Sequence, residues 1–221
     1  MKNRMEREDN MSKTFFISDL HFGHKNALAY DNRPFTSIEE HDKILIDNWN
    51  SVVNIDDDVW VLGDISWHNA TKTIGLLSQL NGGKHLIVGN HDHKLLRNRD
   101  VRAQFIDIYD YKELDIGKRD PLVLCHYPIV CFNRHYTGGY HFYGHVHNSY
   151  EWNMMENYRR QSEELYLKPC NMINVGVMIP YMQFRPQTFG EIITNYDIWK
   201  VSQFTPNAGA APSEVSDDRG E

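Results

Sequence analysis

The chain has 221 residues, of which 41% are hydrophobic and 24% are charged, and its formal net charge is −7 at pH 7. These values are typical of one ordinary globular domain, and they exclude a fibrous or wholly disordered protein. The negative charge argues against a broad basic surface for duplex nucleic acid, because non-specific affinity for DNA comes from lysine and arginine neutralising phosphates. A small phosphorylated ligand is compatible with it.

No feature of the sequence indicates a membrane protein. The longest apolar runs, such as residues 59–62 and 86–88, are far short of the roughly 20 residues that cross a bilayer. The first ten residues are polar and charged, so no secretory signal is expected. The cysteines are an odd number without a close paired spacing, which predicts reduced, buried thiols at Cys125, Cys131 and Cys170. We therefore expect no membrane association and a cytoplasmic location.

In chain order, five short β-branched, aromatic or apolar runs each lead directly into a cluster of Asp, His, Asn or Gly, and these runs are predicted strands. They are residues 14–18, 59–62, 85–88, 122–125 and 140–143. Because helix patterns separate the first three, the first half of the chain is predicted to be alternating α/β.

Three helices are predicted in that first half. Thr36 and Ser37, with Glu39 and Glu40 three residues on, indicate a capping box at the start of a helix that buries apolar side chains at Ile38, Leu45 and Trp49. A second helix is expected over residues 71–80, ending at a glycine pair suited to a left-handed cap, and a third over about 94–104.

The second half is expected to be richer in strands, with candidates at residues 172–177 and 188–194. Residues 150–168 mix aromatic and charged side chains, which favours an amphipathic helix on the sheet over a cap above the site. The expected organisation is a flexible N-terminus (1–12), a single domain (13–205) and a disordered tail (206–221) of Ala, Gly, Ser, Pro and acidic residues.

Each predicted strand delivers polar side chains at its carboxyl end, which is where α/β sheets bind their ligands. The clusters are Asp19-Leu20-His21, Gly63-Asp64, Gly89-Asn90-His91-Asp92, His126 and Gly144-His145-Val146-His147. Any one cluster is weak support for a functional site, but five clusters that each follow a predicted strand favour one. The glycines before three of them allow the backbone to turn sharply and approach a ligand closely.

The chemistry of these side chains points to metal ions. All are nitrogen or oxygen donors, which suits manganese, iron, zinc or cobalt rather than a thiolate site. Seven ligating side chains exceed what one tetrahedral ion needs, whereas two ions sharing a carboxylate would use them all. The charge of two divalent cations exceeds that of the two aspartates, so the resulting net positive site would favour an anion. Such ions also lower the pKa of bound water from 15.7 to about 7, which suits attack on phosphorus.

In this order, Asp-x-His, Gly-Asp, Gly-Asn-His-Asp, a later His and Gly-His-x-His, the motifs from Asp19 to His147 resemble the calcineurin-like metallophosphoesterase family. The resemblance implies a four-layer α/β/β/α sandwich of two mixed β-sheets. It also implies two divalent metal ions, with manganese as first choice and iron, zinc, nickel or cobalt as alternatives.

The resemblance further assigns roles to residues. One ion is held by Asp19, His21, Asp64 and His147, and the other by Asp64, Asn90, His126 and His145. Asp64 bridges the two. His91 contacts the phosphate and protonates the leaving group, and Asp92 orients His91.

Other polar residues near these motifs are weaker candidates. With Asn90 and His91, we expect His24 and Arg134 to contact substrate, although His24 could equally be a polar residue that starts a helix and Arg134 a solvated loop arginine. His93 is expected to face solvent without a metal role.

The predicted function is hydrolysis of phosphomonoesters or phosphodiesters, of small or nucleotide substrates, by a hydroxide bridging the two ions. Two alternatives stay open: a catalytically silent binding or scaffold module of the same fold, and a nuclease with a local groove for single strands. A hydrolase of the metallo-β-lactamase type is excluded, because His145-Val-His147 is followed by Asn148 and Ser149 rather than by Asp and His. The oligomeric state is left undefined.

Overall fold

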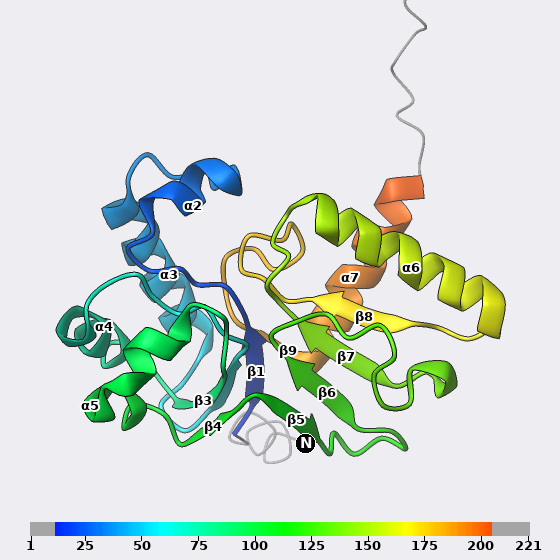
Figure 1. Ribbon diagram of the computed structural model, residues 1–221, viewed down its shortest axis with the longest axis horizontal. Helices are drawn as coiled ribbons and strands as arrows, with labels where there is room; N and C mark the ends of the chain where they lie inside the picture. The colour runs from blue at the N-terminus through cyan, green and yellow to red at the C-terminus, as the bar shows by residue number, and fades with distance from the viewer. Residues whose placement is uncertain (1–11, 205–221) are drawn as a thin grey trace, which may run out of the picture.

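The computed structural model describes residues 12–204, which form an α/β fold built on two mixed β-sheets (Figure 1). The first sheet has the strand order β4-β3-β2-β1-β9. Its strands are β1 (Thr14–Ile17), β2 (Asp58–Val61), β3 (Gly83–Ile87), β4 (Asp107–Tyr109) and β9 (Gln187–Thr188). The first four run parallel, and β9 pairs antiparallel with β1. All four parallel strands therefore end at the same edge.

The second sheet has the order β5-β6-β7-β8. Its strands are β5 (Tyr111–Leu114), β6 (Leu122–Cys125), β7 (Tyr140–Tyr143) and β8 (Asn171–Asn174). The last three run parallel, and β5 is antiparallel to β6. The rings of Phe16 on β1 and Phe142 on β7 meet edge to face, 5.2 Å apart, so the buried faces of the two sheets contact each other in one core.

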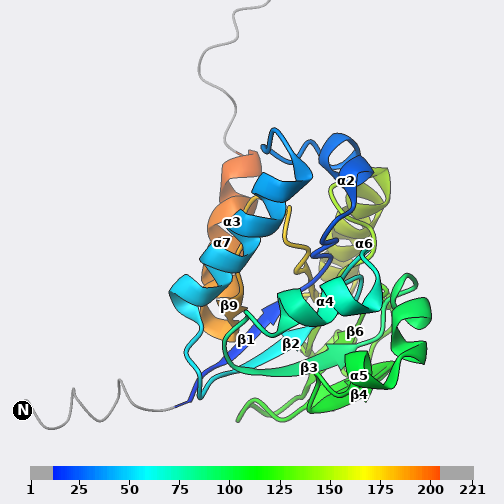
Figure 2. The same ribbon diagram turned by 90° about the vertical axis from the view of Figure 1, so that its left-hand side faces the viewer.

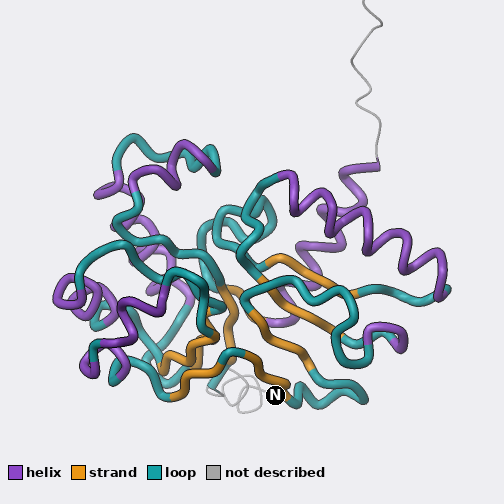
Figure 3. The backbone as a smooth tube through the Cα atoms, in the orientation of Figure 1, coloured by secondary structure: helices purple, strands orange, loops and turns teal. Residues whose placement is uncertain are grey.

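Helices lie outside the two sheets. They are α2 (Lys25–Tyr30), α3 (Ile38–Val52), α4 (Ala70–Leu77), α5 (Arg99–Arg102), α6 (Tyr150–Tyr166) and α7 (Phe189–Phe204), with 3-10 helices η1 (Asp92–Arg97) and η2 (His135–Thr137). Figure 2 looks at the first sheet from the side that carries α3, α4 and α5, and Figure 1 places α6 at the opposite side beside the second sheet. Figure 3 shows loops between these two groups of helices. The arrangement confirms the predicted fold class.

Local sequence explains the first long helix. Ser37 caps α3 by accepting a hydrogen bond from the Glu40 amide, and the Glu40 carboxylate accepts one from the Thr36 amide, as the capping box predicts. Leu45 and Trp49 on its inner face are buried.

Two predicted elements were wrong or incomplete. Of the strand predicted over residues 188–194, only Thr188 lies in a strand, the end of β9, because α7 starts at Phe189 and Thr188 forms a reciprocal cap with Glu191. The helix predicted over 94–104 is broken at Asn98, which has an extended backbone and caps the short helix α5 with its side chain. Of the cysteines, Cys131 is exposed, whereas Cys125 and Cys170 are buried.

Residues 150–168, for which a helix on the sheet and a cap over the site were both considered, contain the helix α6, which packs on the second sheet. Trp152, Glu156, Arg159 and Ser162, spaced three or four residues apart, are the buried residues of α6, and this confirms its amphipathic character. None of the helices described is long and apolar enough to cross a membrane. The predicted flexible N-terminus, except Ser12, and the predicted disordered tail lie outside the described residues.

Candidate metal centre

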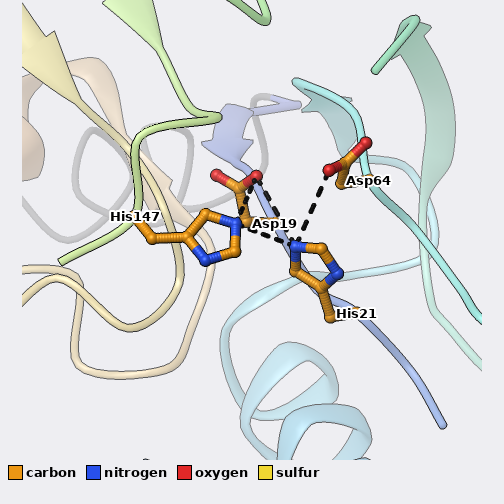
Figure 4. A group of neighbouring side chains, drawn as sticks. All are labelled: Asp19, His21, Asp64 and His147. Carbon is orange, nitrogen blue, oxygen red and sulfur yellow. Dashed lines mark hydrogen bonds and ion pairs between the residues drawn. The ribbon is translucent and has the colours of Figure 1, made fainter. Parts of the chain in front are cut away.

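Four side chains converge where the carboxyl ends of the parallel strands meet. Asp19 and His21 follow β1, Asp64 follows β2 and His147 follows β7, and one ligand atom from each lies within 4.8 Å of the others (Figure 4). Ligand atoms about 2.0–2.2 Å from one ion lie at most about 4.4 Å apart. Small adjustments of these side chains would therefore place all four around a single cation.

A second group adjoins the first and shares Asp64. The side-chain oxygen of Asn90 lies 3.0 Å from both His126 Nε2 and His145 Nδ1. Asp64 Oδ1 lies 3.7 Å from His126 Nε2, while Asp64 Oδ2 lies 3.7 Å from His21 Nε2. The two oxygens of one carboxylate thus face different groups of side chains.

Charges in this cluster are poorly balanced without a cation. Burial raises the pKa of Asp64, and the nearby Asp19 carboxylate raises it further. Burial opposes the charged ring of His147, but its hydrogen bonds to Asp19 and Asp31 raise the pKa of His147 to about 10. The protonated His147 ring therefore supplies positive charge to Asp19 and Asp31, as a bound cation would supply it to the aspartates that it contacts. The donor set fits divalent metal ions.

The backbone at the ligands is unusual. Five of the seven predicted ligands have φ between 48° and 68°, the left-handed region that non-glycine residues rarely adopt: Asp19, His21, Asp64, His145 and His147. Such conformations cost of order 1–3 kcal/mol each and cluster at functional sites. The fold therefore holds these side chains in place at the expense of local stability.

Two glycines are required by the close approach of the ligands. A Cβ on Gly89 would lie 2.3 Å from Asp64 Oδ1, and a Cβ on Gly144 would lie 2.4 Å from Asp19 Oδ2. Any side chain at either position would displace an aspartate. These glycines of the two motifs thus have a steric role.

His91 lies at the open edge of the cluster. Its backbone N–H donates to Asp64 Oδ1 at 3.0 Å, its ring Nε2 is 4.0 Å from Asp64 Oδ2, and its side chain is 48% exposed. This position gives the ring access to a ligand from solvent, so its assignment as proton donor stays a prediction compatible with the geometry.

The carboxylate of Asp92 makes different contacts from the one expected with His91. Its two carboxylate oxygens accept hydrogen bonds from the backbone amides of Asp64, Ile65 and Gly89 at 2.8–2.9 Å. The carboxylate is buried, and burial raises its pKa to about 6. Asp92 therefore fixes the two ligand loops to each other, whereas the expected orienting contact was with the His91 ring.

The weaker candidates differ in their surroundings. His24 starts α2, and its ring stacks on Trp67 with centroids 3.9 Å apart and the planes nearly parallel. Arg134 Nε lies 3.6 Å from the Asp120 carboxylate, and within residues 12–204 Arg134 forms no hydrogen bond or ion pair with the ligand groups. Their substrate roles stay predictions. His93 is exposed, as expected.

Sequence reasoning missed a buried carboxylate that supports the centre. His147 Nδ1 donates to Asp31 at 2.9 Å, so that its Nε2 faces Asp19 and His21. Arg33 holds Asp31 with a hydrogen bond of 2.9 Å, and the same guanidinium donates to the carbonyl of Asp19 at 3.0 Å. Arg33 thus links the loop after β1, which carries Asp19, to Asp31, the hydrogen-bond partner of His147.

Replacing Asp31 by asparagine should weaken manganese binding about 10–100-fold, the usual effect of losing a carboxylate that orients a ligating histidine. The affinity can be measured by titration calorimetry. Asp57→Asn is the matched control, because Asp57 is also buried but accepts its hydrogen bonds from Lys13 and Asn54. Equal affinity of the Asp31 variant and the control would contradict the orienting role.

Comparison with known proteins agrees with the geometry. The sequence profile of calcineurin-like phosphoesterases matches residues 12–176. The fold and the site together define a phosphoesterase scaffold with a metal-site cluster of His and Asp. The chain belongs to the calcineurin-like phosphoesterase family.

Several relatives match part of the chain. The Gene 66 protein of Mycobacterium phage L5 is 37% identical over 137 residues, covering 54% of this chain and 65% of that protein. An uncharacterized protein of Methanocaldococcus jannaschii is 50% identical over 84 residues, covering 37% of this chain and 48% of that protein. The matches thus span less than two thirds of either relative.

A solved structure shares the fold. A protein of unknown function from Aquifex aeolicus superposes with a TM-score of 0.62 at 24% identity, over 83% of this chain and 99% of that chain. The likeness thus covers most of this chain and nearly all of that one.

Proposed function

We propose that this protein hydrolyses phosphomonoesters or phosphodiesters of small or nucleotide substrates at a centre of two divalent metal ions. The observation that carries the proposal is the position of Asp64, whose two oxygens face two separate groups of ligands. Asp19, His21 and His147 would hold one ion with Asp64, and Asn90, His126 and His145 would hold the other with it.

When bound, divalent cations would polarise the phosphate and make water a competent nucleophile at neutral pH. The residues of the chain supply the rest. His126 Nδ1 donates to the carbonyl of Leu62 at 2.7 Å, which leaves its Nε2 lone pair facing the centre. His91, at the open edge, would hold the proton that the leaving oxygen needs.

Removing metal should abolish turnover. Dialysis against a chelator is expected to stop hydrolysis of bis(p-nitrophenyl) phosphate, and manganese should restore it with about two ions bound per chain. Turnover followed at 405 nm, with metal content by mass spectrometry, checks this. Full activity of the metal-free protein would sink the proposal, and two tightly bound ions with no turnover of mono- or diesters would favour a silent binding module.

We also propose manganese as the natural ion and the cytoplasm as the location. The donor set of carboxylate, amide and imidazole suits manganese, and restoring activity with manganese, iron, zinc, nickel and cobalt in turn would rank the candidates.

A further inference from the structure

A cavity of about 800 Å³ opens directly beside the metal centre and includes Asn90 and His91 in its lining. One wall is formed by residues 66–70 after β2, and the other by η1 and Asn98. Ligand sites commonly measure about 300–1,000 Å³, so the space suits a substrate larger than a phosphate group alone.

Three side chains form a row along η1. In a 3-10 helix, residues three apart lie on the same side and are separated by about 6 Å along the axis. His91 is the N-cap of η1, Lys94 and Arg97 follow at intervals of three, and all three line the cavity. The helix thus presents the proposed proton donor first and then two cationic side chains.

These cations are available to a ligand. Lys94 and Arg97 are exposed, and within the described part of the chain neither forms an ion pair. Arg97 also lines a neighbouring cavity of about 440 Å³, together with Arg102 and the carboxylate of Asp110. In a chain with a net charge of −7, unpaired cations concentrated beside the centre indicate an anionic ligand.

The wall opposite the cations is aromatic. Trp67 is 39% exposed, lines the cavity, and lies with its ring centroid 4.2 Å from that of His91. Two further histidine rings, those of His21 and His24, also lie against the indole and hold it in place, with the His24 ring stacked on it. A partly exposed indole beside His91, on the wall that faces the cations, suits the planar base of a nucleotide.

We propose that this cavity holds the leaving-group side of a nucleotide substrate, and that Lys94 and Arg97 bind a second phosphate next to the one that is hydrolysed. The inference rests on the proposed function, because the cavity lies on the leaving-group side only if His91 is the residue that protonates the leaving group. The substrate class is a nucleotide with at least two phosphates, such as a short single strand, rather than a simple phosphomonoester.

The test compares three thymidine dinucleotides that differ only in a terminal phosphate: none, one at the 5′ end, or one at the 3′ end. We expect kcat/KM for cleavage of the internal diester to be at least about tenfold higher for one of the two phosphorylated forms, mainly through a lower KM. Chromatography of the products separates internal cleavage from loss of the terminal phosphate.

The double variant Lys94→Gln/Arg97→Gln should abolish this preference by raising the KM of the favoured dinucleotide. The matched control is Lys72→Gln/Arg160→Gln, which removes two exposed cations outside the lining of this cavity and should keep the preference. Thermal unfolding checks that each variant folds, and Arg97→Gln alone serves if the double variant does not.

The outcomes separate the two proposals. If bis(p-nitrophenyl) phosphate and all dinucleotides resist hydrolysis in the presence of manganese, the proposed function fails. If the diesters are hydrolysed but the three dinucleotides share one kcat/KM, or the double variant keeps the preference, the second-phosphate site alone is overturned.

Discussion

Replacing His91 by alanine should slow hydrolysis of an alkyl phosphodiester by roughly 10²–10⁴-fold, the range that a positioned proton donor contributes. The ring lies at the open edge of the centre, with Nε2 4.0 Å from Asp64 Oδ2 and its side chain 48% exposed, which suits the proposed role. The p-nitrophenolate group leaves without needing a proton, so the loss should be much smaller for bis(p-nitrophenyl) phosphate. Steady-state kinetics with both substrates measure this difference.

Metal content is the control for that variant, because His91 is not among the proposed ligands. A variant that binds two ions and slows both substrates equally would have lost phosphate binding, not proton donation. Unchanged rates for the alkyl ester with both ions in place would show that the proton comes from elsewhere.

Replacing Asp64 by asparagine should have the larger effect, exceeding the roughly 10²–10⁴-fold loss expected for a proton donor. Two divalent ions about 3.5–4 Å apart repel each other, and a shared carboxylate offsets that repulsion. An amide has one oxygen and no negative charge, so it cannot face both groups as Asp64 does. We expect at least one of the two ions to be lost, as measured by mass spectrometry of the purified protein.

The Asp57→Asn variant again serves as the control, because it removes a buried carboxylate that holds backbone amides instead of facing the ligand groups. Should the Asp64 variant retain two ions and the rate of the natural protein, Asp64 would not be the bridge.

Strand ends were predictable because each signal is local. An apolar run followed at once by Asp, His or Asn indicates where a strand stops, and parallel pairing brings these ends to one edge. The strands β6 and β7 match their predictions residue for residue. The proposed ligands converge for the same reason, since each stands within a few residues of a strand end.

Other parts of the fold and of the site depend on contacts between residues far apart in the chain, or on competing local signals, and could not be predicted from the sequence. Asp31 and Arg33 lie on the loop after α2, and nothing in their spacing indicates that they meet His147 from the far half of the chain. Thr188 and Glu191 do carry a capping signal, but the apolar, β-branched residues that follow favoured a strand. The break at Asn98 is similar, because its side chain caps a new helix where continuous helix was expected.

The left-handed backbone at five ligands links ion supply to the persistence of the whole fold. A conformation that is unfavourable in the empty protein becomes part of a favourable complex when ions are present, and a species that binds only the native state shifts the unfolding equilibrium by mass action. Depletion of the ion would then act twice. It would silence the centre, and it would also leave a less durable molecule exposed to proteases and aggregation.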